Sequence, residues 1–98
     1  MDDSTRFALH AYDKILVAAD RKQIEQLIGG MQVGLMWANV FLKDRGQPRL
    51  YCQPERLKIT DSLMIDMMRE TMKDKPNLGD LPLGMMVLVT LQRTFPCK

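Results

Sequence analysis

Apolar residues recur at helical spacing along most of the chain. From Thr5 to Ala19 they are three and four residues apart, which places them on one face of a helix. The same spacing returns from Ile24 to Leu42, and apolar residues line one side of the segment that ends at Lys75. No segment shows the alternating polarity of a half-buried strand. We therefore predict an all-α fold, a compact bundle of four to five helices in a single domain spanning residues 1–98.

Capping residues and prolines set the predicted boundaries. The predicted helices cover about residues 5–19, 21–44, 60–75 and 81–94. Asp20 is the expected N-cap of the second helix, although the first two helices can also be one bent helix. Gly46 is expected to cap its end, and Lys75-Pro76 to end the third helix. Two prolines exclude a helix from the connecting loop, residues 46–58.

Composition limits the class of protein. The chain has 98 residues, of which 46% are apolar and 27% charged, as in globular domains. Its 14 basic and 12 acidic residues give a net charge of +2, which argues against a nucleic-acid or membrane surface. The longest apolar run, Met85 to Val89, is far shorter than the roughly 20 residues of a membrane span. The polar start, Met1 to Thr5, is unlike a signal peptide, which leaves a cytosolic chain and an exported chain without its leader as alternatives.

Side chains that could carry chemistry are few. His10 has no partner at metal-ligand spacing. Asp66 and Glu70 share a helix face with Arg69 and Lys73, as on a solvated charged face. A phosphate-binding loop, a nucleophile elbow and a Cys-His pair are all absent from the sequence. We predict that the chain is not an enzyme and holds neither a metal nor a cofactor.

Methionine is abundant, with nine in the chain. Met64, Met67, Met68 and Met72 lie at helical spacing and are expected to face Met85 and Met86 across a core. A partner-binding surface and a Cu(I) site are the alternatives, because thioethers suit both.

Gly30 and Gly34 lie four residues apart inside the second predicted helix. Glycine inside a helix costs about 1 kcal/mol relative to alanine, so the pair suggests that another backbone packs closely there. Trp37 and Phe41 follow on the same edge. This face is our candidate for a homodimer contact, with packing inside the chain as the alternative.

Two cysteines, Cys52 and Cys97, are 45 positions apart. That separation is too wide for a redox Cys-x-x-Cys pair, and two ligands are too few for structural zinc. A disulfide and two unrelated buried thiols both remain open on spacing. A disulfide would remove on the order of 4 kcal/mol of unfolded-state entropy.

Several motifs together resemble the Rap/Tai family of immunity proteins, which protect bacteria against peptidoglycan-cutting effectors of type VI secretion. They are Gly30-x-x-x-Gly34, Tyr51-Cys52-Gln53-Pro54, the helix from Thr60 to Lys75-Pro76, and the ending Leu91-Gln92-Arg93-Thr94-Phe95-Pro96-Cys97. The resemblance covers about residues 28–98. It implies a helical, often dimeric protein exported to the periplasm, with Cys52 bonded to Cys97. A second disulfide common in the family is missing, since Ile28 stands where its cysteine would be. The first helix must then be held by packing through Ile15, Leu16 and Ile28.

The expected function is therefore non-enzymatic: a periplasmic immunity-type protein that binds and neutralises an amidase-like type VI effector. Its predicted contact surface is the loop before the third helix, namely Arg45, Gln47, Arg49, Tyr51, Gln53, Glu55, Arg56 and Lys58. The alternatives are a small periplasmic holdase that exposes its methionines, and an adaptor of an envelope complex. None of these functions requires nucleic acid, a membrane span or a cofactor.

Overall fold

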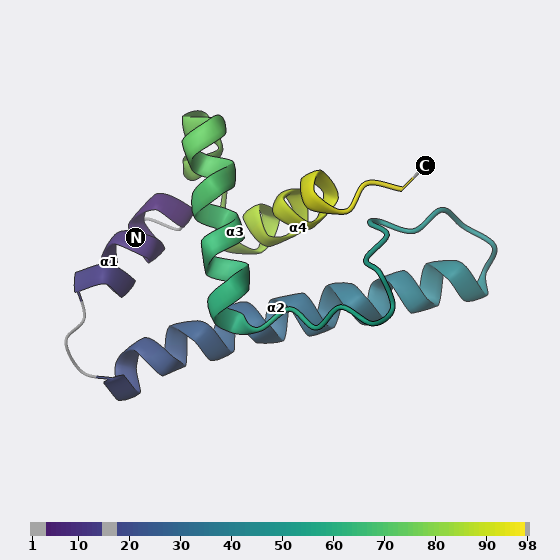
Figure 1. Cartoon of the computed structure of the whole chain (residues 1–98), viewed down its shortest axis with the longest axis horizontal. Coiled ribbons are helices and arrows are strands. Elements are labelled where there is room, and N and C mark those ends of the chain that lie inside the picture. The colour runs from purple at the N-terminus through teal and green to yellow at the C-terminus, as the bar shows by residue number, and fades with distance from the viewer. Residues whose placement is uncertain (1–3, 15–17, 98) are drawn as a thin grey trace.

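The computed structural model describes residues 4–14 and 18–97, and the elements of regular secondary structure in this part of the chain are helices (Figure 1). Its elements are α1 (Thr5–Lys14), α2 (Ala18–Asp44), α3 (Asp61–Asp74), the 3₁₀ helix η1 (Pro76–Asp80) and α4 (Leu83–Thr94). The segment between Gly46 and α3, residues 47–60, turns back and runs along α2 (Figure 1). We call it the return segment.

Three helices, α2, α3 and α4, pack pairwise on one another, and α1 packs against η1 and α4. The predicted compact bundle of four to five helices is thus wrong in its packing, because the mutually packed unit within the described residues has three helices. Length is the physical reason. The 27 residues of α2 extend about 40 Å, about twice the length of α3 or α4. The molecule is accordingly elongated, at 44 × 28 × 25 Å.

The ends of the helices follow local chemistry. The Thr60 hydroxyl accepts a hydrogen bond from the Leu63 amide at 3.1 Å and caps α3. Pro76 follows the end of α3 and opens η1. The predicted N-cap at Asp20 is wrong, because α2 already begins at Ala18. An acidic residue is favourable anywhere in the first helical turn, so the observed position of Asp20, two residues after the start of α2, suits it as well as a cap position would.

Gly46 ends α2 in the left-handed conformation, with φ +69°. Its amide donates to the Lys43 carbonyl at 3.0 Å, and the Gln47 amide donates to the Leu42 carbonyl at 2.9 Å. These two bonds satisfy carbonyls left open at the helix end and reverse the chain direction. The reversal is what brings the return segment back onto α2.

The core lies where α2, α3 and α4 meet. Met64, Met68 and Met86 are fully buried there, in agreement with a core role, whereas Met85 is exposed and does not face them. The buried apolar residues are Leu9, Tyr12, Ile28, Tyr51, Met64, Ile65, Met68, Met86, Val87 and Leu91. In the described residues, no helix is both long and apolar enough to cross a membrane.

The close approach predicted at Gly30 and Gly34 is absent: a Cβ atom added at either would meet nothing within 4 Å. Gly29 is the glycine that is closely packed, since a Cβ there would lie 2.4 Å from Oδ1 of Asp61, at the start of α3. One residue turns a helix by about 100°, so neighbouring glycines face different surroundings. Close packing against another described segment therefore does not explain why glycine occurs at positions 30 and 34.

Candidate functional site

The disulfide between Cys52 and Cys97 is present, which confirms the pairing implied by the resemblance. It has an S–S distance of 1.94 Å, a Cα–Cα distance of 5.0 Å and joins the return segment to the end of the chain. Alongside it, the Cys52 amide donates to the Phe95 carbonyl at 2.8 Å. The return segment is thus fixed to the end of α4 by a covalent bond and a backbone hydrogen bond.

Asn39 holds the same segment from the other side. Its Nδ2 donates to the Tyr51 carbonyl at 2.9 Å, and its Oδ1 accepts from the Leu50 amide at 2.7 Å. One side chain from α2 therefore satisfies two backbone groups that no strand or helix would otherwise pair. Sequence reasoning missed this residue. It is one of three side-chain amides in the uncharged stretch from Gln26 to Leu42, so nothing in the sequence singles it out.

The predicted contact residues separate into two groups. Tyr51 is 2% exposed, and burial raises the pKa of its phenol. Tyr51 therefore belongs to the core beneath the predicted contact surface and is not an exposed contact. Gln53 is half-buried, with its Nε2 donating to the Leu57 carbonyl at 2.7 Å. The other six are exposed: Arg45, Gln47, Arg49, Glu55, Arg56 and Lys58.

A groove separates the return segment from α2. Its two hollows, of about 280 and 450 Å³, share Met36, Tyr51, Gln53 and Glu55. Val33 and Val40 of α2 add to its apolar side and are 50% and 42% exposed. Lys43 and Arg49 stand at one end, and Lys58 and Asp61 at the other. The groove is therefore apolar along the helix and charged at both ends.

Positive charge gathers around this groove. From Lys43 to Lys58 the chain carries five basic and two acidic residues, a net charge of +3, whereas the whole chain carries +2. In the described part of the chain, neither Lys43 nor Arg49 makes an ion pair. Arg45 lies over the Phe41 ring, with its Cζ 4.3 Å from the ring centre. Cations without protein partners are available to an anionic one.

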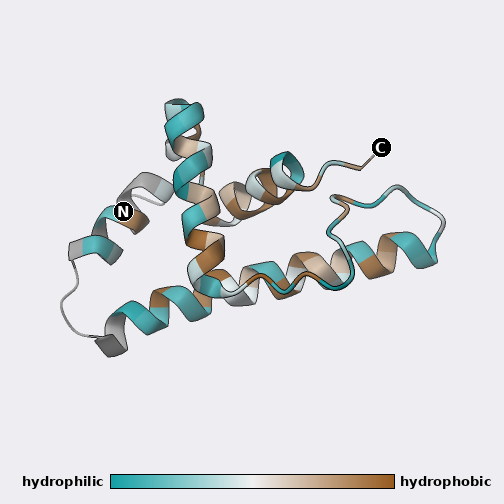
Figure 2. Ribbon diagram, viewed as in Figure 1, coloured by the Kyte–Doolittle hydropathy of each residue, from teal (hydrophilic) through white to brown (hydrophobic). Residues whose placement is uncertain are grey.

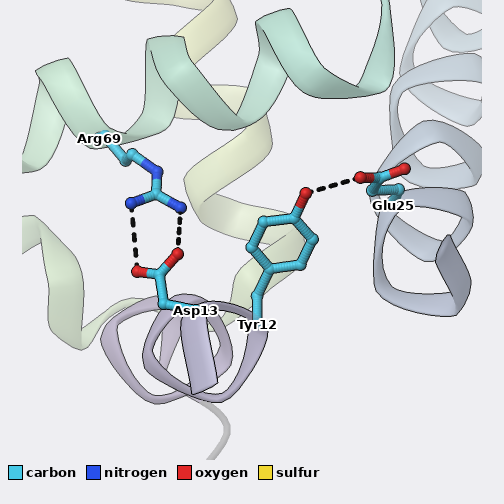
Figure 3. A network of polar contacts seen from close by, with 4 residues as sticks. All are labelled: Tyr12, Asp13, Glu25 and Arg69. Carbon is cyan, nitrogen blue, oxygen red and sulfur yellow. Dashed lines mark hydrogen bonds and ion pairs between the residues drawn. The ribbon is translucent and has the colours of Figure 1, made fainter. Parts of the chain in front are cut away.

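A second polar cluster joins α1 to α2 and α3 (Figure 3). Arg69 donates from both terminal nitrogens to the Asp13 carboxylate, at 2.5 and 3.1 Å. This pairing holds the pKa of Asp13 below its usual value. The Tyr12 hydroxyl donates to Oε1 of Glu25 at 2.6 Å, and that hydrogen bond, with burial, raises the pKa of Tyr12.

This cluster attaches α1 to α2 through Tyr12 and to α3 through Asp13. We expected packing through Ile15, Leu16 and Ile28 to hold that helix. Ile28 is fully buried, while Ile15 and Leu16 lie outside the described residues. The contacts of Asp13 and Tyr12 are the polar part of the attachment, and the sequence analysis did not foresee them.

Other candidate residues are placed as follows. His10, Asp66 and Glu70 are exposed, and within residues 4–14 and 18–97 no three His, Cys, Asp or Glu side chains are grouped to hold a metal ion. Trp37 and Phe41 are 62% and 56% exposed beside Gly30 and Gly34. Of the methionines that the holdase alternative would expose, Met64, Met68 and Met86 are buried, whereas Met36 and Met85 are exposed. Comparison with protein-family models, curated proteins and solved structures found no significant match.

Proposed function

We propose that the chain is a non-enzymatic immunity-type protein that binds and neutralises a peptidoglycan-cleaving, amidase-like effector of type VI secretion. The observation that carries the proposal is the return segment, an exposed basic surface held in place by the Cys52–Cys97 disulfide and by Asn39. Inhibition of this kind needs no catalytic residues. It needs a surface that covers or enters the cleft of the hydrolase.

Preorganisation supports this role. A binding loop loses conformational entropy when it is ordered by its partner, at about 0.5–1.5 kcal/mol for each immobilised flexible side chain. The return segment is already fixed at Cys52 by the disulfide and at Leu50 and Tyr51 by Asn39. Binding would therefore order side chains but not the backbone, which favours affinity.

Charge gives the expected partner its chemistry. Lys43 and Arg49 flank the groove and make no ion pair with another described residue, and Val33, Met36 and Val40 expose apolar surface along it. A partner segment that carries carboxylates beside an apolar side chain would match both. Unpaired surface cations would also accelerate encounter with an acidic partner.

The proposed location is the periplasm. Disulfides persist in oxidising compartments and are rare in the cytosol, so the Cys52–Cys97 bond is compatible with that location. A type VI effector that cuts peptidoglycan acts there as well. The location and the partner class are thus consistent with each other.

The test is inhibition of peptidoglycan cleavage by an amidase-like type VI effector whose gene is found next to the gene for this chain; a gene neighbourhood without any such hydrolase would count against the proposal. The oxidised protein should abolish cleavage at a molar ratio near one to one. Arg49→Glu with Arg56→Glu should weaken inhibition at least tenfold, whereas the control pair Lys22→Glu with Lys73→Glu, which changes the net charge equally, should inhibit like the parent. Undiminished cleavage at a large excess of oxidised protein would refute the proposal.

A further inference from the structure

The Cys52–Cys97 disulfide lies at the surface of the molecule. Cys97 is exposed and Cys52 is half-buried. A hollow of about 360 Å³ is lined by both cysteines and by four residues from the end of α2 and the turn after it, namely Lys43, Gln47, Pro48 and Arg49. Figure 2 shows the last turn of α2 and the turn after it mostly in hydrophilic colours. A thiol in solution can therefore reach this bond, whereas it could not reach a disulfide in the core.

Two cations stand beside the disulfide. Lys43 and Arg49 both line the hollow, and both are exposed. Sγ of Cys97 lies 3.8 Å from the carbonyl oxygen of Arg49, which places that residue directly beside the sulfur. Among the described residues that line the hollow, none carries a carboxylate. Neighbouring cations stabilise thiolates, and a thiolate is both the attacking and the leaving species in disulfide exchange.

We propose that this bond is a site of thiol–disulfide exchange with small anionic thiols, such as thiol peptides that carry free carboxylates. The incoming thiolate attacks Sγ of Cys97, on the more exposed residue, and the new sulfur–sulfur bond forms as the Cys52–Cys97 bond breaks. Cys52 leaves as a thiolate with the electron pair. A second small thiolate then displaces Cys97, so that the protein disulfide is reduced by two electrons and the two small thiols are oxidised to their disulfide. Both cysteine thiolates then equilibrate with protons from solvent.

Exchange would release the covalent link between the return segment and the end of α4. The contacts that remain are the hydrogen bond from the Cys52 amide to the Phe95 carbonyl and the two bonds from Asn39 to Leu50 and Tyr51. The sequence spacing excluded a Cys-x-x-Cys motif, but exchange at this site needs only access and charge. The reaction involves the chain and small thiols alone, so it is independent of the proposed effector.

The test compares the rates at which three small thiols of different charge reduce the oxidised chain: 2-mercaptoethanesulfonate, which is anionic, 2-mercaptoethanol, which is neutral, and cysteamine, which is cationic. Each rate is divided by the rate of the same thiol with the disulfide of 2-mercaptoethanol, because this ratio removes differences in intrinsic reactivity. At about 10 mM salt the normalised rate should be at least about fivefold higher for the sulfonate than for cysteamine, as two cations within roughly 10 Å imply. In about 1 M salt the preference should largely disappear. Equal normalised rates at low salt, or no reduction of the folded chain by any of the three, would overturn the proposal.

Lys43→Gln with Arg49→Gln is the decisive variant, because both side chains are exposed and their replacement leaves the core unchanged. It should lower the preference for the sulfonate at least about threefold. The matched control is Lys22→Gln with Lys73→Gln, which changes the net charge equally at exposed positions that do not line the hollow. The control should keep the preference of the parent. An equal loss in both double variants would trace the preference to net charge and contradict the proposal.

The attacked sulfur can be identified from the mixed disulfide. The reaction with 2-mercaptoethanesulfonate is stopped early with an alkylating reagent, and the modified peptides are identified by mass spectrometry. The sulfonate should be found on Cys97 and the alkyl group on Cys52. A sulfonate adduct found mainly on Cys52 would refute attack at Cys97.

Discussion

The side-chain amide of Asn39 spans Leu50 and Tyr51, donating to the Tyr51 carbonyl at 2.9 Å while it accepts from the Leu50 amide at 2.7 Å. This contact replaces the pairing that a strand would provide and holds the extended return segment against a helix. The Tyr51 ring is thereby placed in the core, and the residues that follow it line the groove. The shape of the candidate surface thus depends on Asn39, a side chain of α2 that also lines the groove.

Replacing Asn39 with Ala should lower the free energy of unfolding by about 2–3 kcal/mol, because two partly buried backbone groups lose their partner. Urea unfolding of the oxidised protein measures this change. Gln26→Ala, on an exposed position of the same helix, is the control and should change stability by less than about 0.5 kcal/mol. Equal effects of the two variants would contradict a structural role for Asn39.

Removing the disulfide should lower the free energy of unfolding by more than the Asn39 replacement does. In the Cys52→Ala, Cys97→Ala double variant the unfolded chain gains the freedom of the 45-residue loop, worth on the order of 4 kcal/mol. That is a large part of the roughly 5–15 kcal/mol available to a domain. Thermal and urea unfolding should both show the loss, and addition of a reductant should destabilise the parent but leave the double variant unchanged. A double variant as stable as the oxidised parent would contradict this prediction.

The Asp13–Arg69 pair predicts a pH-dependent contribution to stability. Because Arg69 lowers the pKa of folded Asp13 below the unfolded value of 3.8, the pair stabilises the fold above that pH. Its contribution falls as the pH drops through the folded-state pKa. Both side chains are over 40% exposed, so Asp13→Asn should cost only about 0.5–1 kcal/mol at pH 7, fading toward pH 2.

Ser62→Ala, at an exposed position of α3, removes no titratable group and serves as the control for this pH series; its difference from the parent should not change with pH. Urea unfolding at several pH values provides the comparison. A difference between Asp13→Asn and the parent that stayed constant down to pH 2 would show that the pair does not act through the charge of Asp13.

Two glycines of α2, Gly29 and Gly34, should respond differently to replacement by alanine. Gly34→Ala should stabilise the fold by about 1 kcal/mol, because its Cβ meets nothing and alanine favours a helix. The stabilisation by Gly29→Ala should be smaller than that by Gly34→Ala by at least about 0.5 kcal/mol, because its Cβ would lie 2.4 Å from the Asp61 carboxylate, which must move. Urea unfolding of the two variants beside the parent measures both changes. Equal stabilisation would disprove the close contact.

Local signals predicted much of the fold. Thr60, Gly46 and Pro76 each act through their immediate neighbours in the chain, so their positions in the sequence indicate where helices begin and end. The start of α2 was misplaced because an acidic residue suits a cap and a first turn equally. The disulfide was anticipated through the family resemblance, since spacing left free thiols open.

Contacts between distant segments were not predictable in the same way. Asn39 meets residues 11 and 12 positions away, and Asp13 meets Arg69 across 56 positions. No local pattern encodes such pairs. The burial of Tyr51 was missed for a related reason, because an extended segment without alternating polarity does not indicate which side chains face the core. These contacts shape the candidate surface and the attachment of α1.

The most direct test of the account is protection in living cells. An amidase-like effector whose gene is found next to the gene for this chain would be directed to the periplasm of a bacterium that also carries this chain, either with an export signal or retained in the cytosol, and growth would be followed. The exported chain should restore growth, the cytosolic chain should not, and the exported Cys52→Ala, Cys97→Ala variant should protect poorly. Lysis in cells that contain the exported, oxidised chain at levels above the amidase would contradict the central claim.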